Sequence, residues 1–490
     1  MDKIYGISKV LPERKEVTPP VMDFSLMGGP GGPGGPGGPG GPGGPEGPGA
    51  MPFGAGGPPP AGFLSAPADA KAALYIRNGQ VDDELSCREY MYAGDLSGRR
   101  LEHGKIVTYG GLNGGICVHG AGALDIDDTV IHINGGDNGY LGGPDSGLSV
   151  VDHADVTLKN SIIDTNGRCR SATIAEGYST LRVYDSVLIS HGIPYGEGIE
   201  KPAGFMATPP ASLEISGNTR THCTLSNSRS FFYNSTIIAD GWAALSTDGA
   251  EGYVYLEAND CNVVTTKGGY GAYSDGECHD RFVRCRFDVA DMAAIIASSS
   301  DMTFIDCDSK CGTYFALMHS IGLPDMLNEL TVSGGTIKSG KEILRMKSCC
   351  ANVDLTAVSM EPGNGILFRT MVNDDEKAPK DPGREVFGYQ IRLHDIDAQG
   401  DILHEDSFRE MWLTLRGSTI RGAILNANLT MDTGSKWYAT GDSTVTLLGE
   451  VNCAQIDAAD GVTIHAVGSA PGEYTLSSGG KLIVSTQKNP

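Results

Sequence analysis

The sequence predicts an all-β solenoid, and three observations support that prediction. Short segments in which apolar and polar residues alternate recur along the chain, a polar turn interrupts each of them, and stretches with helical periodicity are almost absent. A β-solenoid suits such repeats because each coil is too thin to bury its own apolar face and must stack on its neighbours. The chain of 490 residues is also too long for one ordinary compact core.

The repeat is clearest after residue 110, in LDIDDTVIHING, VTLKNSIIDTNG and LRVYDSVLISHG, which begin at Leu124, Val156 and Leu181. Each segment alternates, turns at a polar corner and resumes with branched apolar residues. The corner residues, in chain order, are Asp128, Asn160, Asp185, Asn234, Asp260, Arg284, Asp306 and Gly335, with separations of 32, 25, 49, 26, 24, 22 and 29 residues. We interpret the separation of 49 as close to two coils, and the common period of 22–26 residues as that of a β-solenoid.

Other repeat architectures fit this pattern less well. A propeller blade needs about 40 residues, and a βαβ fold needs helical stretches between its strands. Over roughly residues 110–480 the chain resembles the right-handed parallel β-helix proteins of the pectin-lyase-like class, by its repeat pattern and not by a signature motif. The resemblance implies a right-handed parallel β-helix. It transfers no residue roles, because the NTD and RIK motifs of the polygalacturonase branch are missing.

Composition divides the chain into three expected regions. Residues 28–45 repeat GGP six times, so residues 1–67 are expected to be a largely disordered arm and spacer. Residues 68–110 would cap the solenoid, and residues 111–490 would form the parallel β-helix. Two Pro/Gly/charge-rich stretches, 193–222 and 371–388, are expected to be loops that project from one face. The first is either a wall or lid of a groove or a neutral surface loop.

The net charge and the cysteine pattern limit the expected binding partners and the expected cellular compartment. A net charge of −23 disfavours nucleic acid and anionic membranes as partners. No segment has the pattern of a signal peptide or the roughly 20 apolar residues that cross a bilayer. The twelve Cys residues form no CxxC pair, so zinc is not expected and most thiols are expected to be reduced core residues. We therefore expect a cytoplasmic protein, with a homo-oligomer left open.

Six residues past four of the corners lie Asn134, Asn166, His191 and Asp240, each followed by Gly. Equivalent residues of successive coils in a parallel solenoid stack about 4.8 Å apart, so these four residues should form a column. Asn134 and Asn166 fit an amide ladder. His191 beside Asp240 is an acid/base pair, with either a catalytic role or the role of a hydrogen-bonded turn.

A second expected column collects acidic and His residues that end short apolar strands. Its members are His119, Asp152, His153, Glu176, Asp248, Asp275 and His319. Stacked carboxylates raise one another's pKa, so such a column is a candidate active site or cation site, unless its side chains diverge into water at a wide turn. Calcium could bind Asp152, Glu176 and Asp248, although no cofactor is the preferred expectation.

These columns lead to the hypothesis of an intracellular β-helix enzyme that applies carboxylate/His acid–base chemistry to a neutral, hydroxyl-rich or aromatic small molecule or oligosaccharide. Asp248 or Asp275 would be the general acid, and Glu176 or Asp240 would be the base or nucleophile. His191 and His119 would position the substrate or share the proton. The expected substrate-binding residues are Asp152, Tyr195, Trp242, Tyr270 and Tyr273.

Two further questions stay open at this point. Hydrolase, lyase and isomerase chemistry fit the columns equally well. The alternative from a different class is a non-catalytic, adhesin-like or structural β-solenoid with a Gly-Pro stalk. Basic residues between 110 and 320 are sparse and none falls in either column, so a polyanionic substrate is not expected without a metal.

Overall fold

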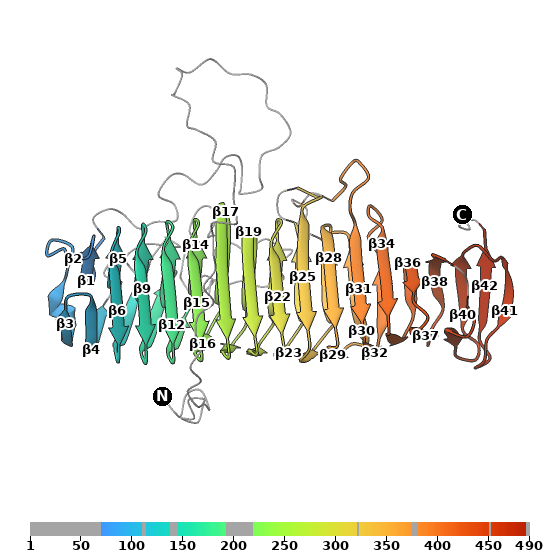
Figure 1. Ribbon diagram of the computed structural model, residues 1–490, viewed down its shortest axis with the longest axis horizontal. Coiled ribbons are helices and arrows are strands. Elements are labelled where there is room, and N and C mark those ends of the chain that lie inside the picture. The colour runs from blue at the N-terminus through green and yellow to red at the C-terminus, as the bar shows by residue number, and fades with distance from the viewer. Residues whose placement is uncertain are drawn as a thin grey trace, which may run out of the picture.

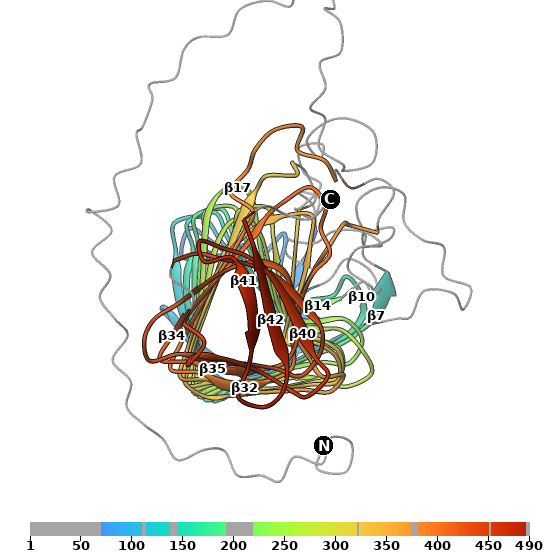
Figure 2. The same cartoon turned by 90° about the vertical axis from the view of Figure 1, so that its right-hand side faces the viewer.

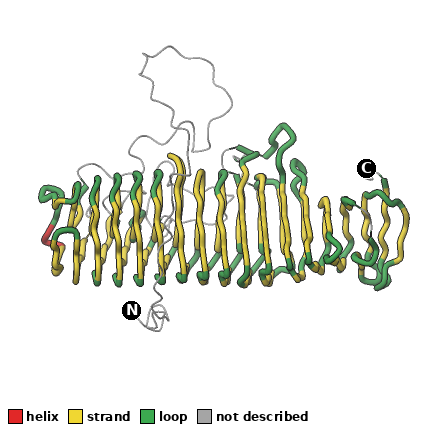
Figure 3. Tube along the Cα trace, viewed as in Figure 1, coloured by secondary structure: helices red, strands yellow, loops and turns green. Residues whose placement is uncertain are grey.

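The computed structural model describes residues 70–109, 114–137, 146–192, 219–320, 323–374, 378, 380–449 and 452–486. These residues form one stack of β-strand coils along a single long axis (Figure 1). Strands make up most of the stack, and in the described ranges the helical content is one short 3-10 turn, η2 (Arg88–Tyr90) (Figure 3). The predicted all-β parallel β-helix is confirmed. The expected arm and spacer, residues 1–67, lie outside the described residues.

Each coil runs in turn through three faces, which enclose a roughly triangular interior in the end view (Figure 2). Face 1 comprises β1 (Ala72–Arg77), β5 (Gly114–His119), β8 (Leu148–Val151), β11 (Thr173–Glu176), β14 (Arg220–Leu225), the first parts of β17 (Ala243–Asn259) and β19 (Tyr270–Val283), β21 (Met292–Ala297), β24 (Ala316–His319), β27 (Leu344–Lys347), β30 (Ile366–Met371), β33 (Asp401–His404) and the first part of β36 (Ile424–Met431).

Face 2 comprises the first part of β4 (Arg100–Tyr109), β6 (Ala123–Asp127), β9 (Asp155–Lys159), β12 (Thr180–Tyr184), β15 (Arg229–Tyr233), the later parts of β17, β19 and β36, β22 (Asp301–Ile305), β25 (Leu327–Ser333), β28 (Cys350–Thr356), β31 (Tyr389–His394) and β34 (Met411–Arg416). Three strands, β17, β19 and β36, therefore pass from face 1 to face 2 as continuous strands, and β17 and β19 are the longest of them. The sequence pattern predicts only short strands here.

Face 3 comprises the later part of β4, β7 (Val130–Asp137), β10 (Ile162–Arg168), β13 (Val187–His191), β16 (Thr236–Ala239), β18 (Asn262–Thr265), β20 (Arg286–Val289), β23 (Asp308–Cys311), β26 (Thr336–Ser339), β29 (Ser359–Pro362), β32 (Asp397–Gln399), β35 (Thr419–Arg421), β37 (Lys436–Ala439) and β39 (Ile456–Ala458). The strands of each face pair in parallel with their equivalents in the next coil, so side chains stack in columns. Face 3 is interrupted between β29 and β32, because β32, β35, β37 and β39 form a separate four-stranded sheet.

The interior is a continuous apolar core to which all three faces contribute. Phe282 and Phe304 lie on face 2, Phe287 on face 3 and Phe315 at the start of face 1. Their rings meet at centroid separations of 4.9 to 5.4 Å. These contacts join neighbouring coils, as stacking in a solenoid requires.

The predicted polar corners form one column between faces 2 and 3, which confirms that prediction. Asp128, Asn160, Asp185 and Asn234 have φ values of 47°, 47°, 48° and 48°. Asn and Asp tolerate this left-handed conformation because their short side chains bond locally, and Asn234 Nδ2 donates to Asp185 Oδ1 at 2.6 Å. The reading of the 49-residue separation as two coils is wrong: Tyr184 pairs directly with Tyr233, so it is one coil that carries an insertion.

Antiparallel strands close both ends of the stack. At the first end β2 (Gln80–Val81) pairs with β1, and β3 (Met91–Ser97) pairs with β4. At the other end β38 (Ser443–Leu447), β40 (Thr463–Val467) and β42 (Lys481–Ser485) stack in parallel, and β41 (Gly472–Thr475) pairs antiparallel with β42. Of the helices in the described part of the chain, none is long and apolar enough to cross a membrane.

Candidate functional site

The second predicted column exists, but two of its expected members, Asp152 and His153, lie in the turn that follows β8. This column occupies the carboxyl ends of the face 1 strands, and we call it the end column. In chain order, its residues are Arg77, His119, Val151, Glu176, Leu225, Asp248, Asp275, Ala297, His319 and Lys347. Val151 takes the place expected for Asp152. Asp152 is the next residue, in a left-handed turn, with its side chain 56% exposed and Oδ2 3.7 Å from His119 Nε2.

Register shows which acids of the end column are neighbours. Asp248 and Asp275 pair directly, so they are adjacent. Leu225 lies between Glu176 and Asp248, which places Glu176 two coils away, on the order of 10 Å. His119 precedes Asp248 by four coils, on the order of 20 Å, and is not brought to the Asp248–Asp275 pair.

The Asp248–Asp275 pair lies on the outward side of face 1, yet both residues are buried, with 8% and 7% of their surface exposed. Tyr273 projects from the same side of β19, and its hydroxyl donates to Asp275 Oδ2 at 2.9 Å. Burial and the neighbouring Asp248 charge raise the pKa of Asp275 to about 6, although hydrogen bonds from Ser298 and Tyr273 oppose the shift. Asp275 can therefore carry a proton near neutral pH.

Aromatic side chains adjoin this pair on the same side of face 1. Trp242, Tyr270 and Tyr273 belong to one buried cluster with Ala243, Met292, Ile295, Tyr314 and Leu317. The rings of Trp242 and Tyr270 meet edge to face, with centroids 5.7 Å apart. Three of the five predicted substrate-binding residues are therefore neighbours of the acids. Asp152 is not among them, and Tyr195 lies outside the described residues.

Arg220 is the residue of this region that the sequence analysis missed. The expected loop 193–222 included it, but β14 begins at Arg220, which pairs with Ala243 of the next coil. Its guanidinium carbon lies 5.1 Å from the centre of the Trp242 ring. Arg220 is 5% exposed, so the region holds a buried cation beside its acids. A register count back from Ala243 would have found it, had the length of the insertion been known.

The first predicted column also exists, on the outward side of face 3. Asn134, Asn166 and His191 are in register, and Asp240 follows β16 in the next coil. His191 Nδ1 lies 3.1 Å from Asp240 Oδ2, as the acid/base pairing requires. A second carboxylate, Asp164, which the sequence analysis did not single out, lies 3.1 Å from His191 Nε2.

Further charges complete this set, which we call the face 3 ladder: His132, Asp164, His191, Asp240 and Lys267. Hydrogen bonds to Asp164 and Asp240 raise the pKa of His191 despite its partial burial. The Lys267, His191 and Thr266 bonds lower the pKa of Asp240 against the effect of burial. Both ring nitrogens of His191 already face carboxylates, so the ladder resembles a charge-balanced turn more than a free acid/base pair.

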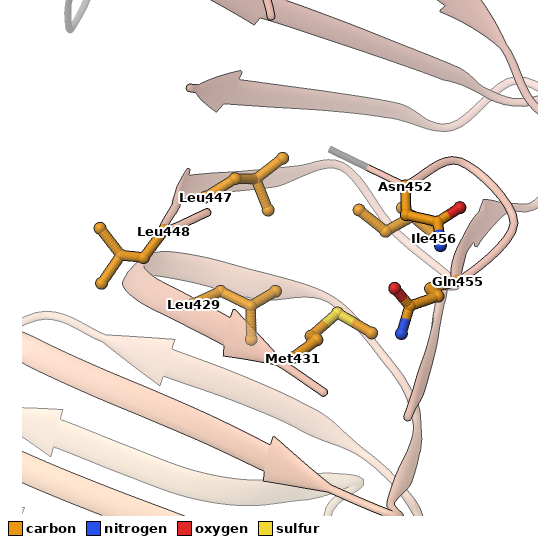
Figure 4. A pocket seen from close by; sticks show the side chains of 7 residues that line it. All are labelled: Leu429, Met431, Leu447, Leu448, Asn452, Gln455 and Ile456. Atoms are coloured by element: carbon orange, nitrogen blue, oxygen red, sulfur yellow. The ribbon is translucent and has the colours of Figure 1, made fainter. Parts of the chain in front are cut away.

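The two columns do not share one groove. Asp240 lies before the start of face 1 and Asp248 at its end, and the extended stretch Ala243–Asp248 alone spans on the order of 15 Å. Asp240 therefore cannot act together with Asp275 on one bond. A further small pocket near the far end of the stack is lined by Leu429, Met431, Leu447, Leu448, Asn452, Gln455 and Ile456 (Figure 4). This lining has no titratable side chain and offers no acid–base chemistry.

Fold and geometry together define a class: an all-β parallel β-helix that carries a buried carboxylate pair, an arginine and aromatic rings on the outward side of one face. In the described part of the chain, no group of three or more His, Cys, Asp or Glu is placed to hold a metal ion. The sequence matches no protein-family model, and no curated protein matches it. The geometry of the site is therefore the basis for its function.

Proposed function

We propose that the protein is an acid–base enzyme whose catalytic pair is Asp275 and Asp248. The observation that carries the proposal is the direct stacking of these two acids, buried on an outward face and beside aromatic rings. Stacked carboxylates destabilise each other, and a purely structural column has no need of them. Perturbed carboxyl groups that adjoin one another are typical of catalytic sites.

The environment assigns different roles to the two acids. Asp275, with its pKa raised to about 6, is the general acid that protonates a leaving group. Asp248 is the base or nucleophile, in the role that the sequence analysis gave to Glu176 or Asp240. Tyr273 holds Asp275 in place through its 2.9 Å hydrogen bond.

The spacing of the two carboxyl groups favours glycoside hydrolysis over lyase and isomerase chemistry. Carboxyl groups on adjacent coils lie on the order of 5 Å apart, the separation typical of retaining glycosidases. Trp242, which keeps 7% of its surface exposed, supplies a flat apolar surface on which a sugar ring or an aromatic substituent packs. A pectin-lyase-like ancestry fits the fold and an oligosaccharide substrate, and this assignment belongs to the proposal.

The test compares Asp275→Asn and Asp248→Asn with the wild-type protein on a panel of aryl glycosides. We expect the wild type to release phenol from at least one member, and each substitution to lower kcat by about 10²- to 10⁴-fold. Thermal unfolding at pH 7 should show Asp275→Asn to be at least as stable as the wild type. The reason is that ionisation of the buried Asp275 carboxyl group destabilises the folded state, and the substitution removes this group.

Asp306→Asn is the matched control. Asp306 is exposed at a left-handed corner, where Asn is equally well tolerated, so this substitution should leave both activity and stability unchanged. Full activity in both Asp275→Asn and Asp248→Asn would refute the proposed pair. Inactivity of the wild type on every glycoside would refute glycoside hydrolysis.

A further inference from the structure

Arg220 and Trp242 present three buried donor nitrogens that lack an acceptor. Nε and Nη1 of Arg220 and Nε1 of Trp242 are buried and have no hydrogen-bond partner. The two side chains are in contact, with the guanidinium carbon over the indole ring. Among the residues that the structure describes, no carboxylate forms an ion pair with Arg220, although Asp248 and Asp275 both lie near enough to influence charge in this region.

Such a set of donors is costly in a folded protein. A buried donor without a partner costs about 1–3 kcal/mol, and more when it belongs to a charged group. Most buried polar groups are paired, so an unpaired cluster calls for a specific explanation. The nearest acids, Asp248 and Asp275, do not supply one, because none of their oxygens accepts a hydrogen bond from these three nitrogens. A ligand that brings its own acceptor atoms would satisfy all three donors.

The donors and their neighbours specify the chemistry of that ligand. A guanidinium with unpaired N–H groups selects an oxyanion, since charge-assisted hydrogen bonds are the strong ones. One arginine balances one negative charge, and a dianion would be repelled by the acids at the end of the same face. The surrounding side chains, which include Tyr270, Met292 and Ile295, are apolar or aromatic and favour a flat hydrocarbon body.

We propose that Arg220 and Trp242 form a carboxylate-binding subsite, and that the ligand of this face is an aromatic or otherwise apolar carboxylic acid. The inference rests on the proposed function in placing the ligand on the Asp248–Asp275 face. It replaces the expected neutral substrate with a monoanion. The carboxylate lies against Arg220, the ring packs on Trp242, and the reacting bond reaches the acids at the end column.

The test measures ligand binding by isothermal titration calorimetry on the full chain, with benzoate, benzyl alcohol and inorganic phosphate as probes. The wild type should bind benzoate at least tenfold more tightly than benzyl alcohol or phosphate. Arg220→Gln should lower benzoate affinity by at least tenfold. Trp242→Phe keeps an aromatic ring but removes the indole N–H donor, so a loss of about threefold or more in benzoate affinity is expected even if Arg220→Gln fails to fold.

Two controls separate this inference from the proposed function. Arg286→Gln alters an exposed arginine on face 3 and should leave benzoate affinity unchanged. Asp275→Asn should keep benzoate affinity while it lowers kcat by about 10²- to 10⁴-fold. Equal affinity for benzoate and benzyl alcohol, preference for phosphate, or unchanged affinity in both Arg220→Gln and Trp242→Phe would overturn the subsite. Those results would leave the catalytic pair to be judged by its own kinetics.

Discussion

At the scale of single residues, His191 shows how neighbouring coils set the charge of a side chain. Its two ring nitrogens each lie 3.1 Å from a carboxylate oxygen, of Asp164 on one side and Asp240 on the other. The hydrogen bonds to these carboxylates raise the pKa of His191 above its ordinary value. The charged imidazole therefore stabilises the folded chain by linking three successive coils.

This linkage predicts a pH-dependent loss of stability in His191→Gln. The pKa of His191 is higher in the folded chain than in the unfolded chain. The contribution of His191 to the free energy of unfolding is therefore complete below about pH 6.5, and it is lost as pH rises through the folded-state pKa. Denaturation of both proteins between pH 5 and pH 9 should show a destabilisation that is largest at the acidic end. His465→Gln, at an exposed position near the far end, should show no such trend. A pH-independent difference for His191→Gln would contradict the prediction.

The sequence predicted the contact between His191 and Asp240 but not the third residue of this group, Asp164. The position of His191 and Asp240 six residues past their corners correctly predicted their contact. Asp164 was missed because it lies two residues before its coil's column position and reaches His191 diagonally. Alignment of repeats compares equivalent positions only, so diagonal partners are invisible to it.

At the scale of elements, the stacked strands depend on aromatic contacts inside the coils. Phe304 on β22 is 1% exposed and touches Phe282, Phe287 and Phe315, which lie on the three faces. One side chain thus joins all three faces of the stack. Its removal would leave a cavity that the rigid stack cannot close.

Phe304→Ala is therefore expected to lower the free energy of unfolding by about 3–5 kcal/mol. Chemical denaturation monitored by circular dichroism measures this change. Phe387→Ala removes the same atoms from a side chain that is 46% exposed, and its effect should stay within about 0.5 kcal/mol. Equal effects of the two substitutions would show that the interior contacts do not support the stack.

The elements themselves were largely predictable, because alternation and polar corners are local signals. Face 2 and face 3 strands begin and end near the corners read from the sequence, such as Asn160 and Asp185. The start of β14 was not predictable, since nothing local marks where a long insertion returns to the coil at Arg220. The separation from Asp185 to Asn234 was misread for the same reason.

At the scale of the whole molecule, antiparallel strands cover the exposed strand edges at the two ends of the stack. β41 covers β42 in antiparallel fashion, and β42 covers β40. An open strand edge offers unpaired backbone groups to another chain, so natural sheets block or cover such edges. The hairpin at the far end therefore limits growth of the stack.

Deletion of residues 468–490 should convert this end into a self-association site. The truncation removes β41 and β42 and exposes the edge of β40 (Thr463–Val467). Light scattering after size exclusion should then give a larger mass per particle than the full chain gives at the same concentration. Deletion of residues 487–490 alone, beyond β42, should not change the mass. A truncated chain with the mass of the full chain would argue against the protective role.

Whether the two columns lie close together in space could not be predicted from the sequence. The repeat pattern places each residue within its coil, and it correctly grouped Asp248 with Asp275. Whether two columns face one another depends on how the corners turn the chain, which the pattern does not encode. The structure places Asp240 and Asp248 at opposite ends of one face.

The parallel stacking also has a mechanical consequence. Backbone hydrogen bonds between coils run along the long axis, because each strand pairs with its equivalent in the next coil. Tension between the two ends of the stack would load these bonds lengthwise and one coil at a time, so the molecule would peel from its ends in a series of small force steps. The middle coils, which hold Asp248 and Asp275, would be among the last to open.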